Sequence, residues 1–475
     1  MKQRDFTKGK IFGPMFLFAI PIILTNVLQT FYNIADNIIV GKFSGDDLAL
    51  SAVGATASIS ALVLNAILGI AVGSGVVVSR AFGAGDDKKV SRSVHTAITF
   101  GAVLGLFLGV MMFILTPHIL ILTDVKEELM ANATLYLRIL FAALPATSVY
   151  NFAAATLRSV GDSRTSLRIL ALSGLLNVGM NLVFVLCFHM SVGGVALATA
   201  ISKYVSAIAV VTVLIRRRGE VYAFSPRKAK ISREELFEML RFGIPNGIQN
   251  SMFSISNILF TVAMNSLDTY VLGAKAIAMN LTGVANNVSS SYMNAMLTFS
   301  AQNYGAKKPE RIQKSLRICL FQGAVLTFVV GMVIYLFVDP ISSLYISDSD
   351  PLRELTMMCA RSIATVTLPL YFICTAQNAT AGALRGMGYS TIPMITSILG
   401  ICVYRVLWIL FVFPLEPFHN ARGIYLAFPI SWVLVTLANL ITIGIVFGKV
   451  KRKLDSEREL LETRQEEVAC PSKNA

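Results

Sequence analysis

The stretch FAIPIILTNVLQTFYNIADNIIVG, residues 18–41, is a long apolar run that contains a proline, several amides and one acid. Its polar residues Asn26, Gln29, Asn33 and Asp36 are three, four and three positions apart. On an α-helix this spacing places them on one face. A charged side chain in hydrocarbon costs on the order of a few kcal/mol, so it is normally paired, or faces a cavity. The stretch therefore predicts a membrane-spanning helix with one polar face and a specific role for Asp36.

The rest of the chain has the same character. Of its 475 residues 55% are hydrophobic and 14% charged, and the mean hydropathy is +0.66. A spanning helix needs about 20 mostly apolar residues, whereas a membrane strand alternates over about ten. About twelve long apolar runs are present, at 12–40, 48–78, 94–116, 133–155, 167–188, 192–215, 236–267, 274–301, 318–338, 363–383, 392–413 and 424–447. We expect an all-α integral membrane protein with about twelve transmembrane helices.

The net charge of +14 reports orientation rather than a nucleic-acid partner. Basic residues concentrate in alternate connectors, such as the one with Lys88, Lys89 and Arg92, and in the polar stretch 216–235. Cytoplasmic loops carry this excess of lysine and arginine. We expect both termini to be cytoplasmic. The six cysteines show no CxxC spacing, so neither a disulfide framework nor a metal centre is predicted from them.

The second half of the sequence repeats features of the first in the same order. The matching pairs are FAIP (18–21) with FGIP (242–245), AFGAGDDKKVSRS (81–93) with NYGAKKPERIQKS (303–315), TLRSVGDS (156–163) with ALRGMGYS (383–390), and GGVALATAIS (193–202) with RGIYLAFPIS (422–431). Six helices per half make the two lobes parallel in the membrane. We predict an amino-terminal lobe at 1–215, a basic cytoplasmic linker at 216–235, a carboxy-terminal lobe at 236–447 and a charged cytoplasmic tail at 448–475, with the lobes enclosing a central cavity.

Prolines and amides indicate where that cavity lies. Pro21 and Pro245 interrupt corresponding helices of the two halves, as do Pro145 and Pro369, and such pairs point to a transport site. We expect Pro21 and Pro245 to bend their helices. The amides recur at helical spacing and are interpreted as cavity lining, with helix-to-helix hydrogen bonding as the alternative for any single one. The proposed lining residues are Asn26, Gln29, Asn33, Asn151, Asn250, Asn257, Asn280, Asn287 and Asn378.

Other function classes find little support in the sequence. It has no GxxxxGK[ST] loop for ATP, and no HExxH, GxSxG or paired acids at membrane depth, so we expect neither an enzyme nor a bound cofactor. A channel would need a ring of like residues. Secondary transport by alternating access remains, with Asp36 as the best candidate for a coupling-ion site. The deeper charges Arg138, Lys203 and Arg405 have no role that the sequence can assign.

Several segments together resemble the multidrug and toxic compound extrusion (MATE) family of the flippase superfamily. They are DNIIVGKFSGDDLALSAVGA (36–55), FGAGDDKKV (82–90), YGAKKPERI (304–312), the LRSVGDS and ALRGMGYS pair, and GGVALATAIS. The resemblance covers nearly the whole chain. It implies two six-helix lobes around a central cavity and export of amphipathic, often cationic, drugs driven by inward flow of H⁺ or Na⁺. It also implies a bacterial cell-membrane location, and we expect a monomer.

The resemblance assigns a coupling site residue by residue. Asp36 matches the functional aspartate of helix 1, Asn177 the asparagine of helix 5, and Thr199 the threonine of helix 6 in the amino-lobe cation site. Asn181 stands where many members have a second aspartate. We therefore expect cation coupling through Asp36, Asn177, Asn181 and Thr199, with Na⁺ at Asp36 and Asn177 as one option and a proton as the other. A lipid-linked precursor flippase, or another small-metabolite exporter of the same superfamily, is the alternative function.

Overall fold

The computed structural model describes residues 5–43, 48–346 and 351–469, and within these ranges the regular structure is helical, without a strand. This confirms the all-α expectation. The first half holds α1 (Phe12–Phe43), α2 (Ala49–Ala84), α3 (Asp87–Leu122), α4 (Glu127–Ala142), α5 (Leu144–Ser159), α6 (Ser163–Leu182), which continues as a π-helical turn (Val183–Cys187), and α7 (Val192–Arg216).

The second half follows a linker with one short 3₁₀ turn (Pro226–Lys228). It holds α8 (Arg233–Met264), α9 (Thr269–Gly305), α10 (Pro309–Leu336), α11 (Val338–Ser343), α12 (Arg353–Thr367), α13 (Tyr371–Gly386), α14 (Thr391–Ser397), a π-helical stretch (Ile398–Val403), α15 (Tyr404–Leu407), a second π-helical stretch (Trp408–Val412), a 3₁₀ turn (Glu416–Phe418), α16 (Ala421–Tyr425) and α17 (Ala427–Ala469). Each predicted span falls on helix. The end of the predicted tail, residues 470–475, lies outside the described residues.

Length and composition make the chain a multi-pass membrane protein. Eight helices are long and apolar enough to cross a bilayer, or up to ten if each of two bent helix pairs forms one span. The two other predicted spans, α8 and α9, have 32 and 37 residues but do not meet the same apolar criterion. These two helices carry the asparagines of the predicted polar faces, which lower their hydropathy.

Both bent pairs occur at repeat-related prolines. The axes of α4 and α5 differ by 44° and those of α12 and α13 by 46°. Pro145 lies in the first turn of α5, and Pro369 lies in the break between α12 and α13. Proline removes a backbone donor and clashes with the preceding turn, which explains a break at these positions. Pro21 and Pro245, in contrast, lie inside the continuous helices α1 and α8.

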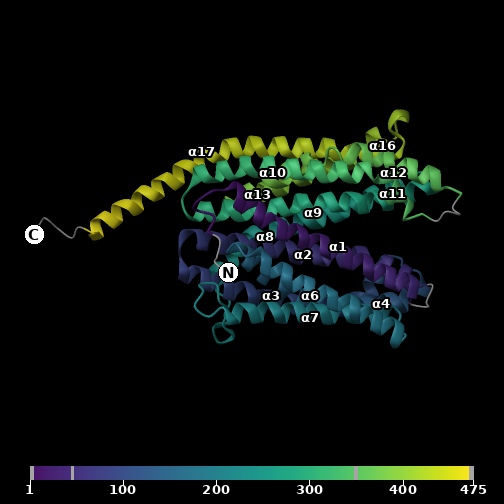
Figure 1. The fold of residues 1–475 in the computed structure, drawn as a ribbon, viewed down its shortest axis with the longest axis horizontal. Coiled ribbons are helices and arrows are strands. Elements are labelled where there is room, and N and C mark those ends of the chain that lie inside the picture. Colours follow the sequence, from purple (N-terminus) through teal and green to yellow (C-terminus); the bar gives the residue numbers. More distant parts are fainter. Residues whose placement is uncertain (1–4, 44–47, 347–350, 470–475) are drawn as a thin grey trace, which may run out of the picture. The chain divides into compact units, whose positions relative to one another are not determined.

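The chain separates into two compact units. Among the described residues, unit 1 contains Leu17–Val78 and Asp87–Ile258, and unit 2 contains Asp5–Phe16, Ser79–Asp86 and the chain from Leu259 onward. Within unit 1, α6 and α7 pack side by side, and within unit 2, α9 packs against α13 (Figure 1). The first part of α8 belongs to unit 1.

Small residues allow the helices of unit 1 to approach closely. A Cβ added at Gly105 of α3 would lie 2.8 Å from the carbonyl oxygen of Leu144, and one at Gly109 would lie 2.8 Å from that of Phe141. A Cβ at Gly73 of α2 would lie 2.2 Å from the Met239 oxygen of α8. Glycine at these positions lets backbones touch, which is how helices gain contact area in a membrane. The glycine spacing of α3 therefore fixes its contact with the α4–α5 pair.

Candidate functional site

A polar cluster lies at the centre of unit 1, and we call Asp36, Asn177, Asn181 and Thr199 the Asp36 cluster. Asn181 Nδ2 donates to Asp36 Oδ1 at 2.5 Å, and Thr199 Oγ1 donates to Asp36 Oδ2 at 3.3 Å. Asn177 Nδ2 in turn donates to Thr199 Oγ1 at 3.2 Å. The structure thus brings the four residues predicted for cation coupling into one hydrogen-bonded network that joins α1, α6 and α7.

Local geometry explains why the cluster forms. Asn177 and Asn181 are one helical turn apart on α6, and both are buried, with exposures of 4% and 0%. Gly174, less than one turn before Asn177, makes room for α1, because a Cβ there would lie 1.9 Å from the Tyr32 ring. Tyr32 Oη then donates to the Ala171 carbonyl at 3.2 Å. The contact between α1 and α6 therefore depends on a glycine that faces a tyrosine.

Two cavities border Asp36. The smaller, of about 60 Å³, lies between α1, α6 and α7. The larger, of about 350 Å³, lies between α1, α2, α4, α5 and α7. Asp36, Asn33, Thr199 and Lys203 line both, Gln29 and Asn177 line the smaller, and Tyr136 lines the larger. A carboxylate held by hydrogen-bond donors on one side and open to cavities on the other can exchange a proton or bind a small cation.

The cluster offers oxygen ligands beyond the carboxylate. Asn177 Oδ1 and Asn181 Oδ1 are buried without a hydrogen-bond partner in the described part of the chain. Together with Asp36 and Thr199 Oγ1 they form an all-oxygen donor set, the kind that hard cations prefer. Among the described residues, no group of three or more His, Cys, Asp or Glu side chains gathers.

Of the residues predicted to line a cavity, the structure places only some beside Asp36. Gln29 and Asn33 line the cavities beside Asp36, whereas Asn26, Asn151, Asn250 and Asn257 lie elsewhere in unit 1. Asn151 Nδ2 donates to Thr147 O in its own helix at 2.8 Å. In unit 2, Asn280 is exposed and donates to Ala276 O at 3.1 Å, Asn378 donates to Ser289 Oγ at 2.7 Å, and Asn287 is half-buried. Asn378 thus links α13 to α9, as the helix-to-helix alternative predicts. Asn151 and Asn280 instead donate to the preceding turn of their own helices.

In unit 2, side chains of a different kind occupy the positions that correspond to the Asp36 cluster. Counted from the matched repeats, Asp36 corresponds to Phe260, Thr199 to Phe428 and Lys203 to Trp432. The ring centroids of Phe260 and Phe428 are 5.0 Å apart, and those of Phe428 and Trp432 are 6.2 Å apart. With Tyr425, whose ring stacks on Phe428 at 5.3 Å, these residues form what we call the aromatic cluster. Among the described residues, these matched positions carry a polar network in unit 1 and aromatic rings in unit 2.

The deeper charges have distinct surroundings. Arg405 in unit 2 is buried, with its guanidinium 3.7 Å from the centroid of the Phe428 ring. Arg138 in unit 1 lies 5.2 Å from the centroid of Phe113. Lys203 lies one helical turn after Thr199 and is the cation whose charge acts on Asp36. From the sequence, Lys203 has no assignable role and Tyr136 is not recognised as a site residue. The reason is that the sequence does not show which helices pack beside these two residues.

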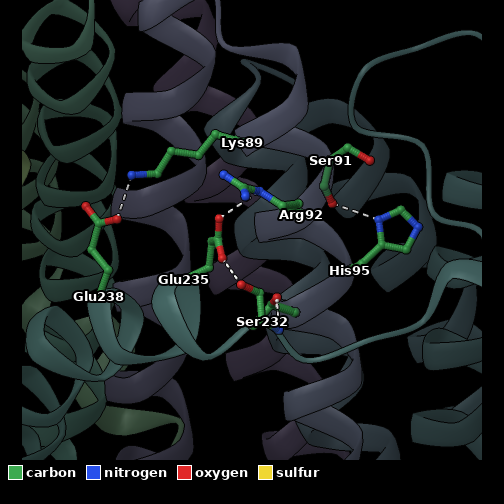
Figure 2. A network of polar contacts seen from close by, with 8 residues as sticks. Lys89, Ser91, Arg92, His95, Ser232, Glu235 and Glu238 are labelled. Atoms are coloured by element: carbon green, nitrogen blue, oxygen red, sulfur yellow. Dashed lines mark hydrogen bonds and ion pairs between the residues drawn. The ribbon is translucent and has the colours of Figure 1, made fainter.

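The segment between α7 and α8 is held at one end of unit 1 by a second polar network, drawn in Figure 2. Lys89 Nζ lies 2.8 Å from Glu238 Oε2. Arg92 Nε lies 3.0 Å from Glu235 Oε1, and Ser232 donates to the other oxygen of Glu235. Basic residues of α3 therefore pair with acidic residues at the start of α8. These ion pairs attach the end of the predicted linker to α3.

Histidine and arginine extend this attachment. His95 Nδ1 lies 2.7 Å from Ser91 O and Nε2 accepts from the Ser225 backbone N–H at 3.0 Å, so His95 carries its proton on Nδ1. Arg217 Nη2 lies 2.6 Å from Asp162 Oδ2, at the start of α6. Burial raises the pKa of the Asp162 carboxyl, but hydrogen bonds from Thr165 and Arg217 outweigh this and hold that pKa below its usual range.

Comparison with known proteins relates both halves of the chain to one family. The family model MatE matches residues 21–183 and 245–410. The probable multidrug resistance protein YoeA of Bacillus subtilis is 27% identical over 402 residues, which is 83% of this chain and 85% of that protein. The probable multidrug resistance protein NorM of Thermotoga maritima is 28% identical over 406 residues, 82% of each chain.

Solved structures agree on the fold. A crystal structure of MATE in complex with MaL6 superposes with a TM-score of 0.87 at 19% identity, covering 95% of this chain and 100% of that one. The outward-facing conformation of a multidrug resistance MATE family transporter of the MOP superfamily gives a TM-score of 0.86 at 19% identity, covering 95% and 99%. With the family model matched in both halves, the chain belongs to the MATE family.

Proposed function

We propose that this chain is a secondary active exporter of amphipathic, often cationic, drugs, driven by inward flow of H⁺ or Na⁺. The observation that carries the proposal is Asp36, an acid inside a spanning helix that bonds to α6 and α7 and borders two cavities. The names of two relatives, multidrug resistance proteins of Bacillus subtilis and Thermotoga maritima, support the substrate class.

The proposed coupling follows from the hydrogen-bonding capacity of a carboxyl group. Ionised Asp36 only accepts, and it accepts from Asn181 and Thr199. Once neutralised by a proton it becomes a donor, and once bound to Na⁺ it shares its oxygens with the ion, so both events change the bonds between α1, α6 and α7. We infer that ionised Asp36 favours drug binding and closure toward the outside. Neutralisation then rearranges α1 near Pro21 and releases the drug outward.

The driving force is sufficient for one ion per cycle. Moving one elementary charge down about 150 mV releases roughly 3.5 kcal/mol. That free energy corresponds to a drug gradient of about three hundredfold. If the drug carries one positive charge, one-for-one exchange cancels the electrical contribution, and only the chemical gradient of the ion drives export.

The same proposal includes the arrangement of the chain in the membrane. We propose two six-helix lobes, 1–215 and 236–447, with the linker and both termini in the cytoplasm of a bacterial cell, acting as a monomer without a bound cofactor. The clustering of basic residues in the linker end supports this orientation. The amides Asn26, Asn250, Asn257, Asn280 and Asn287 are proposed to line the drug path.

The test is dye efflux from proteoliposomes that contain the full chain. Ethidium is loaded, and proton and sodium gradients are imposed separately at matched membrane potential. We expect at least one gradient to accelerate efflux in the natural protein and neither to do so in Asp36→Asn. The matched control is Asp339→Asn, which removes an exposed acid that pairs with Arg361 in unit 2. Gradient-driven efflux by Asp36→Asn at the natural rate would refute the proposal.

A further inference from the structure

Lys203 is the cation whose charge acts on Asp36. It nevertheless forms no hydrogen bond or ion pair with the described residues of the Asp36 cluster. It lies four residues after Thr199 on α7 and lines both cavities that Asp36 lines. Its charge acts on Asp36, and in the described part of the chain its ammonium has no hydrogen-bond or ion-pair partner. A lysine ammonium carries three donors and one positive charge, so it needs acceptors.

The Asp36 cluster contains acceptors without a donor in the described part of the chain. Asn177 Oδ1 and Asn181 Oδ1 are buried and have no hydrogen-bond partner among the described residues, and Asn177 lines the smaller cavity together with Lys203. Unsatisfied buried acceptors are costly, and either a metal cation or an ammonium satisfies them. Lys203 and Asn177, which carries one of these two unsatisfied oxygens, therefore line the same cavity.

The second repeat lacks both charges at the corresponding positions. In unit 2 the residue that corresponds to Asp36 is Phe260, and the residue that corresponds to Lys203 is Trp432. Both positions are part of the aromatic cluster and are buried, with exposures of 5% and 4%. Where the acid is absent the lysine is absent too. This pairing favours Lys203 as the countercharge of Asp36 over a lysine that only reaches for the membrane surface.

The other ionisable groups around the cavities do not supply that countercharge. The groups that line them are Tyr32 of α1, Asp36 of α1, Tyr136 of α4 and Lys203 of α7. The tyrosines carry no positive charge in any protonation state. Among the residues that the structure describes, Lys203 is thus the one positive side chain that lines these two cavities, and a metal ion that entered beside Asp36 would meet it.

We propose that Lys203 is the built-in countercation of Asp36 and makes the site select against Na⁺. The inference rests on the proposed function, since it concerns which ion can neutralise Asp36 there. Two like charges close together in a low-dielectric site repel strongly. Without the lysine, the carboxylate, the hydroxyl and the two amide oxygens form a site that accepts Na⁺.

Ion binding is measured apart from transport, with the purified full chain in detergent. The thermal unfolding midpoint is followed while NaCl replaces KCl at constant ionic strength, because a ligand that binds the folded state raises that midpoint. The variants are Lys203→Met and Lys203→Gln, with Lys203→Arg as the matched control that keeps the charge. Size-exclusion profiles establish which variants are folded.

We expect no sodium-specific stabilisation of the natural protein or of Lys203→Arg. Lys203→Met and Lys203→Gln should show a saturable stabilisation by Na⁺, with an apparent affinity at least about tenfold higher than in the natural protein. The double variant Asp36→Asn/Lys203→Met should lose this response, which places the ion at Asp36. In proteoliposomes the single neutral variants should gain a response to a sodium gradient.

Three results would overturn the inference. One is a sodium response in the natural protein as strong as that in Lys203→Met. Another is a folded Lys203→Met or Lys203→Gln protein that does not respond to Na⁺, and the third is a response that survives in the double variant. None of these results depends on whether Asp36→Asn stops efflux, so failure here is distinguishable from failure of the proposed function.

Discussion

The Asp36 cluster and the aromatic cluster occupy corresponding positions of an internal repeat, yet their contents are opposite. In unit 1 Asp36, Asn177, Thr199 and Lys203 line cavities, and Asn181 donates to Asp36. In unit 2 the matching places hold Phe260, Phe428 and Trp432, which pack ring against ring. The difference teaches that the repeated scaffold tolerates either a polar cluster beside cavities or packed aromatic rings at this place, and it leads us to expect ion chemistry in unit 1.

The aromatic cluster should carry stability and no coupling. Phe260→Ala removes a side chain that is 5% exposed and contacts Tyr425 and Phe428. Truncation of a buried phenylalanine costs about 3–5 kcal/mol. We expect a clear fall in the thermal unfolding midpoint in detergent, while the folded fraction still responds to an imposed ion gradient. Loss of the gradient response at an unchanged unfolding midpoint would mean that the aromatic cluster contributes to coupling and not to stability, the opposite of what we expect.

The Asp36 cluster should show the opposite behaviour. Asn181→Leu removes the donor 2.5 Å from Asp36 and keeps a side chain of similar size. Because hydrogen bonds to charged groups contribute about 1.5–3 kcal/mol, gradient-driven efflux should fall by roughly tenfold to a hundredfold. A control in the second repeat is Tyr404→Phe, at the position that corresponds to Asn177, one helical turn before Asn181; it should leave efflux unchanged. Equal losses in the two variants would mean that coupling is not confined to unit 1.

The contact between α1 and α6 can be tested with a pair of glycines on one helix. A Cβ at Gly174 would lie 1.9 Å from the Tyr32 ring, whereas a Cβ at Gly179 would meet nothing within 4 Å. Overpacking costs about 1–3 kcal/mol, so Gly174→Ala should lower the unfolding midpoint and displace α1. Gly179→Ala should be neutral or stabilise by up to about 1 kcal/mol. Equal unfolding midpoints for the two variants would show that the Tyr32 ring can move away from residue 174 without a loss of stability.

The smallest expected effect concerns acid sensitivity at the linker end of unit 1. The pKa of Asp162 is held below its usual range, so its bonds stabilise the folded state fully above about pH 4 and are lost as the pH falls further. Asp162→Ala should cost about 1–2 kcal/mol at neutral pH and flatten this acid dependence. Asp339→Ala, from the exposed pair with Arg361 in unit 2, should cost less than about 1 kcal/mol. A larger loss for Asp339→Ala would contradict the assignment.

The sequence predicts much of this arrangement because a few residue types determine it. Apolar length predicts the helices, and Pro145 and Pro369 mark the two breaks. The family resemblance selects Asn177, Asn181 and Thr199, and the structure brings all three into one hydrogen-bonded network with Asp36. Amide spacing alone was a weaker guide, because an asparagine in a membrane helix satisfies itself equally well within its own turn, as Asn151 does.

Other features could not be read from the sequence, because they depend on which helices face each other. The approach of Tyr136 and Lys203 to one cavity requires α4 and α7 to pack beside α1. The acidic start of α8 reads as an ordinary solvated turn, yet Glu235 and Glu238 pair with Arg92 and Lys89 of α3. Such pairings between distant segments leave no local periodicity, so they become visible only in three dimensions.

The central claim is that Asp36 couples ion entry to drug exit, and ion flux measured together with drug flux tests it most directly. Proteoliposomes with the full chain are loaded with drug, without an imposed ion gradient, and the movement of H⁺ and of Na⁺ is recorded as the drug leaves. We predict that drug efflux drives ion uptake in a fixed ratio in the natural protein and drives none in Asp36→Asn. Drug efflux that draws in ions equally in both proteins would contradict the claim.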